Sequence, residues 1–107
     1  METVFLVFRS QFCYLIYMHD EIIDAVLARG LHADACRQHP LVGWIVMKDP
    51  PDYAGKFSAR LVTDAPTPYV LVADTLAEIH ARLPSMLERS GRSPDDLPEV
   101  VEIWFSR

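Results

Sequence analysis

One stretch of this chain, Phe57–Leu83, limits the fold more than any other, because its pattern predicts strand, turn, strand and helix. Apolar and polar side chains alternate along Phe57–Asp64, as in a strand with one buried and one wet face. Pro66 and Pro68 then break the strand, since proline cannot donate a backbone hydrogen bond. The run Tyr69–Ala73 is rich in strand-forming residues. We therefore expect an antiparallel pair of strands that leads into a helix.

The helix after the second strand begins at a capping signal. Thr75 precedes Glu78 by three residues, so its hydroxyl can accept from the Glu78 amide while the Glu78 carboxylate reaches back. Ile79 and Leu83 continue an apolar stripe at helical spacing. Pro84 cannot donate a helical hydrogen bond, so we expect the helix to end or kink there.

Two further strands flank this stretch. Leu41–Lys48 is almost continuously apolar, which is typical of a central strand. Asp49–Lys56 is rich in proline and predicts the turn of an antiparallel hairpin. Apolar side chains alternate in Glu99–Phe105, so we expect this segment to be the last strand, after a polar loop at Ser90–Pro98.

Two helices are predicted before the first of these strands. His19–Ala28 carries carboxylates in its first turns, where they interact favourably with the helix dipole, and Gly30 is a stop signal. Leu31–His39 predicts a second short helix, and Ser85–Arg89 a further helical turn. The buried side of the first helix is expected to consist of Ile22, Ile23, Val26 and Leu27.

Together these elements predict an α+β fold. After the N-terminal helices the chain runs β-β-β-α-β, and the helical connection carries the last strand back across the sheet with a right-handed crossover. We expect a four-stranded mixed sheet of spatial order 3-2-1-4, with the last strand beside the first and parallel to it. The helices would cover one face and leave the other open to a partner.

The first 17 residues are unusually apolar. Thr3–Phe8 and Phe12–Tyr17 are separated by a short polar break, and each is far shorter than the roughly 20 residues that cross a bilayer. No basic residue precedes them and no small-residue cleavage site follows, which argues against a signal peptide. Two interpretations stay open. Residues 1–17 form an extra strand or hairpin, or translation starts at Met18. Under either interpretation, residues 18–107 are a single α+β domain.

Charge and cysteine content restrict the partner and the compartment. A net charge of −5 disfavours nucleic acid as the main partner, because phosphate binding needs a surplus of Lys and Arg. Two cysteines, Cys13 and Cys36, do not make a disulfide framework in 107 residues. We therefore expect a reduced, cytoplasmic setting without a membrane span.

The best candidate for a metal site is His32, Cys36 and His39. In a helix, spacings of four and three residues place these side chains on one stripe, and thiolate with imidazole suits zinc. His19 or Asp34 could supply a fourth ligand. The alternative, which we favour, is a half-buried cysteine with two surface histidines, because no second ligand cluster accompanies the first.

No catalytic motif is complete. Cys36 as a nucleophile would need an oxyanion donor or a glycine-rich turn, and neither accompanies it. Glu78 and Glu102 hold places that a ribonuclease-H-like nuclease would use for metal ions, but the strand Leu41–Lys48 has no carboxylate. The four glycines form no phosphate-binding loop. We therefore expect no enzymatic activity and no resident cofactor, zinc at the candidate site excepted.

Aromatic and basic residues favour an interaction surface instead. Trp44, Tyr69 and Trp104 lie on neighbouring predicted strands, and Arg60 belongs to a basic cluster near the hairpin. Exposed aromatic side chains on a sheet mark a protein interface more often than a small-molecule pocket. We therefore expect a small interaction or regulatory module, homodimeric or bound to another protein.

Several segments carry a resemblance to known sequences: Trp44–Val46, Ala54–Phe57, Ala59–Leu61, Thr63–Leu71, Ala73–Glu78 and Pro98–Phe105. Between residues 44 and 105 they look like a small family of uncharacterised proteobacterial proteins. No activity is assigned to that family, so the resemblance implies no function.

The order β-β-β-α-β, with Asp74–Glu78 entering the helix, is similar to HicB-type antitoxins. In these proteins a degraded ribonuclease-H-like domain blocks a toxin, so the similarity implies an inhibitor of a partner toxin. The chain departs from that pattern, because Pro66-Thr67-Pro68 replaces the usual Pro-Gly-Cys segment and no DNA-binding extension is evident.

Overall fold

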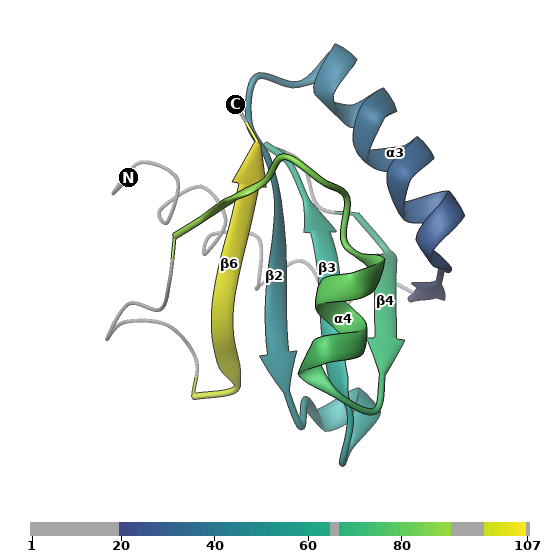
Figure 1. Cartoon of the computed structure of the whole chain (residues 1–107), viewed down its shortest axis with the longest axis vertical. Coiled ribbons are helices and arrows are strands. Elements are labelled where there is room, and N and C mark those ends of the chain that lie inside the picture. Colours follow the sequence, from purple (N-terminus) through teal and green to yellow (C-terminus); the bar gives the residue numbers. More distant parts are fainter. Residues whose placement is uncertain (1–19, 65–66, 91–97, 107) are drawn as a thin grey trace.

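The computed structural model describes residues 20–64, 67–90 and 98–106, which form an α+β fold around one sheet (Figure 1). In chain order the elements are β1 (Glu21–Ile22), α3 (Ala25–Gln38), β2 (Val42–Lys48), the 3-10 turn η1 (Pro51–Tyr53), β3 (Phe57–Val62), β4 (Tyr69–Ala73), α4 (Leu76–Arg82), β5 (Glu88–Arg89) and β6 (Val100–Ser106). The six strands lie side by side in the order β1-β4-β3-β2-β6-β5. The α+β class is therefore confirmed.

The prediction of a four-stranded sheet is wrong, because β1 and β5 extend the sheet at its two edges. Each of these strands has only two residues, too few for an alternating pattern to reveal them. Between them lie the longer strands in the order β4-β3-β2-β6. The short edges also leave little exposed backbone for unwanted pairing.

The direction predicted for the last strand is also wrong. β6 runs antiparallel to β2, with Trp104 opposite Trp44, whereas a parallel pair was expected. The reason is β5, which follows α4 and pairs antiparallel with β6. The chain that crosses over through α4 therefore forms β5, which runs parallel to β2. The next strand, β6, runs in the opposite direction and lies between β5 and β2.

The two predicted N-terminal helices are one helix, α3. It begins late, because the Asp24 side chain caps it by accepting a hydrogen bond from the Leu27 amide at 2.8 Å. Gly30 does not stop it, since an internal glycine costs a helix only about 1 kcal/mol and the buried stripe continues past it. That stripe faces the sheet and consists of Ala28, Leu31, His32 and Ala35.

The helix α4 begins as the capping signal predicts. The Glu78 amide donates to the Thr75 hydroxyl at 3.2 Å, and the helix ends at Arg82, before Pro84. The further helical turn expected at Ser85–Arg89 does not form. Met86 has a φ of 66°, which a right-handed helix excludes, and the chain enters β5 instead.

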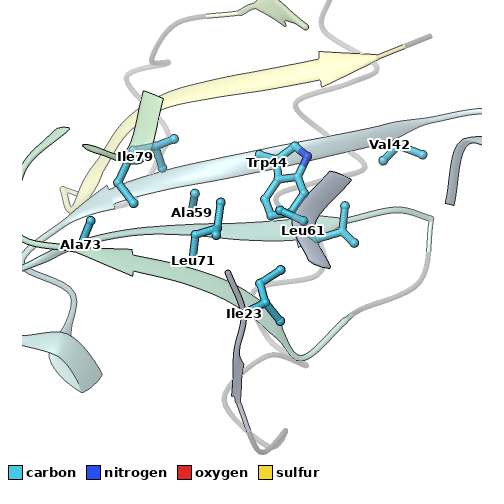
Figure 2. Close-up of a cluster of buried hydrophobic side chains, with 10 residues drawn as sticks. Ile23, Val42, Trp44, Ala59, Leu61, Leu71, Ala73 and Ile79 are labelled. Atoms are coloured by element: carbon cyan, nitrogen blue, oxygen red, sulfur yellow. The ribbon is translucent and has the colours of Figure 1, made fainter. Parts of the chain in front are cut away.

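The core is divided by the sheet. Both helices cover the first face (Figure 1), where Ala28 of α3 belongs to the buried cluster. Ile79 of α4 packs on this face with Trp44 and its neighbours (Figure 2). The second face has a buried cluster of its own: Ile45, Val62, Val100, Ile103 and Phe105. Ile45 is 1% exposed and Phe105 is fully buried, so the side chains of the face that we expected to be open are buried.

Four predictions fall outside the described residues. These are the extra N-terminal strand or hairpin, the alternative start at Met18, His19 as a fourth metal ligand, and most of the Ser90–Pro98 loop. Within the described part of the chain, neither helix has the length and apolar character needed to cross a membrane.

Candidate functional site

His32 and Cys36 lie together on α3, as their spacing predicts. His32 Nε2 is 3.5 Å from Cys36 Sγ, and His32 Nδ1 accepts a hydrogen bond from the indole N–H of Trp44 at 3.1 Å. An indole can only donate, so the Nδ1 lone pair is occupied and the proton of neutral His32 sits on Nε2. His32 therefore donates to the sulfur of Cys36 and cannot accept the thiol proton.

His39 does not join this pair. It follows the C-terminus of α3 and bonds through Nδ1 to the carboxylate of Asp64. In residues 20–64, 67–90 and 98–106, no group of three or more His, Cys, Asp or Glu side chains is placed to hold a metal ion. Asp34, a predicted fourth ligand, instead bonds to Arg37 at 2.9 Å. The geometry at these residues thus offers a metal neither a free imidazole nitrogen at His32 nor a converging third ligand.

We expect His32 to make the fold acid-sensitive. Burial lowers the pKa of His32 below its ordinary value of 6.5, so between these two values the unfolded chain binds a proton that the folded chain resists. The stability that His32 contributes is full above pH 6.5 and is lost as the pH falls toward the lowered pKa, by at most about 1.4 kcal/mol per pH unit. Urea unfolding of the wild type and His32→Gln between pH 7 and pH 5 measures the difference.

Glutamine is the matched replacement, because its carbonyl oxygen can still accept from Trp44 but does not titrate. The pH dependence of the variant should therefore be shallower than that of the wild type. Parallel curves for the two proteins would contradict the role assigned to His32.

The four predicted interaction residues have different surroundings. Trp44 is fully buried and belongs to the core. Arg60 bonds to the carboxylate of Asp20 at 2.7 Å, and both side chains are largely buried, at 13% and 15% exposed. Tyr69 and Trp104 are only partly buried, against the edge of the first cluster. Trp44 is therefore out of reach of a partner, and Arg60 is committed to Asp20, whereas Tyr69 and Trp104 are partly accessible.

A pocket of about 590 Å³ opens on the first face of the sheet, between α4, β5 and β6. We call it the α4–β6 pocket. Trp104 is one of its walls, and the turn that joins α4 to β5 forms its rim, with Met86 at 92% exposed. The remaining apolar wall consists of Leu76, Leu83, Pro84 and Leu87.

The polar side of this pocket is built around Glu102. Alternation along β6 places Glu102 and Trp104 on one side, and the register places Arg89 of β5 opposite Trp104. The Glu102 carboxylate is 3% exposed and accepts from Trp104 Nε1 at 2.8 Å and from His80 Nε2. Arg89 Nε lies 3.3 Å from its second oxygen. A buried carboxylate is tolerated here because three donors surround it.

The sequence pattern did not reveal this cluster. His80 and Glu102 are 22 residues apart and meet only because α4 packs on the face of the sheet to which Glu102 of β6 points. The His80 ring stands edge-on to Trp104, with centroids 5.7 Å apart, which fixes the imidazole at the mouth of the pocket.

A second surface was also missed. Ile22, Val26 and Leu27 were predicted to be buried in the first helix, but they are 64%, 66% and 53% exposed. Val26 and Leu27 are exposed because α3, capped by Asp24, begins so that Ala28 faces the sheet, whereas Ile22 lies ahead of the helix in β1. Asp24 was the signal in the sequence that could have placed this boundary. We call these three residues the β1–α3 surface.

Comparison of the chain with protein-family models, with curated proteins and with solved structures finds no match. The resemblances to a proteobacterial family and to HicB-type antitoxins therefore stay predictions.

Proposed function

We propose that this protein is a small interaction module that associates with a second copy of itself through the β1–α3 surface. The observation that carries the proposal is the exposure of Ile22, Val26 and Leu27, each more than half exposed within six consecutive residues. Single exposed aliphatic residues are normal on a protein, whereas a contiguous group favours a contact surface.

The backbone beside these side chains supports the same use. The amides of Glu21 and Ile23 donate inward to the carbonyls of Pro68 and Val70, both at 2.9 Å. In a parallel pair the residue between them, Ile22, turns its N–H and C=O away from the neighbouring strand. Two copies related by a two-fold axis could therefore exchange a pair of hydrogen bonds at Ile22 and continue the sheet.

Charges near the surface are compatible with a symmetric pair. Glu21 and Asp24 lie at one end of the segment and Arg29 at the other, and all three are exposed. In an antiparallel arrangement of two copies the acidic end of each faces the basic end of its partner. Such pairing favours one register and disfavours others.

Light scattering coupled to size exclusion tests the proposal. The wild type is expected to approach twice the 12.2 kDa mass of one chain as its concentration rises. Leu27→Asp is expected to remain monomeric, because association would bury its carboxylate in an apolar contact. The fold should tolerate the change, since Leu27 is 53% exposed.

Ala33→Asp is the matched control, because it places the same charge on an exposed position of the same helix, two turns beyond Val26 and so roughly 10 Å further along the helix axis. It should associate as the wild type does. A wild type that stays monomeric at every concentration, or an Ala33→Asp protein that dissociates as readily as Leu27→Asp, would exclude this surface.

A further inference from the structure

We propose that the α4–β6 pocket binds a small apolar carboxylic acid, whose carboxylate pairs with Arg89 and whose apolar part packs against Trp104 and the leucines of the pocket. This site lies beside β5, at the edge of the sheet opposite β1. It therefore does not depend on association through the β1–α3 surface.

Shape and lining favour a small molecule. About 590 Å³ is within the range of roughly 300–1,000 Å³ that small-molecule pockets occupy. Most of the wall is aliphatic, and Trp104 adds an aromatic surface. Met86 at the rim is 92% exposed, and its flexible thioether can adapt to the shape of an apolar ligand.

The charges favour a carboxylate over a cation. Glu102 cannot serve as a counter-ion for a ligand, because its carboxylate is 3% exposed and already held by His80, Trp104 and Arg89. An amine that enters the pocket would gain no free acceptor from Glu102 and would meet the guanidinium of Arg89.

Arg89 has two terminal nitrogens that the described residues do not use as hydrogen-bond donors. Its side chain is 59% exposed, and only its Nε lies against Glu102, at 3.3 Å. Among the described residues, no hydrogen bond or ion pair engages its two terminal nitrogens. Those nitrogens form a planar pair of donors, which matches the two oxygens of a carboxylate. Because Glu102 orients the guanidinium from one side, the open side is left for a ligand.

Calorimetry with 4-phenylbutanoate, 4-phenylbutanamide and 4-phenylbutylamine tests the proposal, with the indole N–H of Trp104 followed by NMR. The acid should bind and shift the Trp104 resonance, and the amide and the amine should bind about tenfold more weakly or not at all. Arg89→Gln should weaken binding of the acid by about tenfold and leave binding of the amide unchanged. Met86→Ser should weaken binding of the acid and the amide alike.

Arg37→Gln is the matched control, because Arg37 is similarly exposed, at 69%, and lies on α3, away from the pocket. It should bind the acid as the wild type does. The Leu27→Asp protein should also bind it normally, which separates this site from self-association. The proposal is overturned if the acid does not bind, if the amide or the amine binds as tightly as the acid, or if Arg89→Gln binds the acid like the wild type.

Discussion

Replacement of Trp44 by alanine is expected to lower the free energy of unfolding by about 3–5 kcal/mol. Trp44 is fully buried between the sheet and the helices, so the change leaves a large cavity in the core (Figure 2). It also removes the donor to His32 Nδ1 and leaves a buried acceptor without its partner. Urea unfolding followed by circular dichroism measures the loss without the need for tryptophan fluorescence.

Trp104 gives a matched comparison, because it lies directly opposite Trp44 across β2 and β6 but is only partly buried. Trp104→Ala is expected to cost less, about 2 kcal/mol, because much of its indole already borders the α4–β6 pocket and because His80 and Arg89 still hold Glu102 when the indole donor is lost. If Trp44→Ala does not fold, Trp44→Phe keeps most of the volume and should still cost about 2 kcal/mol through the unpaired His32. Equal costs for the two alanine variants would contradict the difference in burial.

Replacement of Arg60 by methionine is expected to cost about 3 kcal/mol, because it strands the largely buried carboxylate of Asp20. The Tyr53 hydroxyl still donates to Asp20 at 2.7 Å and limits the loss. Burial and that bond to Asp20 raise the pKa of Tyr53 to about 12, so its hydroxyl remains a donor at neutral pH. Chemical unfolding at neutral pH measures the cost.

Lowering the pH should reduce the loss of stability caused by Arg60→Met. Burial alone would raise the pKa of Asp20, but the hydrogen bonds from Arg60 and Tyr53 outweigh it and hold the pKa below its ordinary value of 3.8. The pair therefore stabilises the wild type above pH 3.8, and this contribution is lost as the pH falls through the lowered pKa. The difference in free energy of unfolding between the wild type and Arg60→Met should therefore become smaller as the pH falls through this range. Arg37→Met, which breaks the exposed pair with Asp34, should cost less than about 1 kcal/mol and show no such change.

The parts of the fold that the sequence predicts are those with strong local signals. The run Phe57–Asp64 marks β3, although the expected wet face is wrong because Ser58 and Val62 are buried. The Thr75 capping box marks the start of α4. The two edge strands are not predicted, because a strand of two residues is too short to show an alternating pattern. Tertiary contacts set their pairing with β4 and β6. The predicted direction of β6 was wrong because it depends on β5, which the sequence pattern does not reveal.

The candidate sites show a similar division. The spacing of His32 and Cys36 predicts that they share a helix face, and they do. The hydrogen bond from Trp44, which decides the chemistry of His32, links residues 12 positions apart and cannot be read from the helix alone. The α4–β6 pocket is harder still, because Glu102 draws its partners from α4, β5 and β6 itself.

The position of β2 has a consequence for how the chain reaches its native state. One edge of β2 is paired early, through the nearby turn to β3, but the other waits for β6, where Val46 meets Glu102. Closing the long loop between Val46 and Glu102 costs conformational entropy before the strands make stabilising contacts. We therefore expect the pairing of β6 with β2 to limit the folding rate. Until it is complete, the apolar strand at the centre of the sheet presents an open edge to other chains. Nascent or truncated forms that lack β6 should therefore be the ones that aggregate.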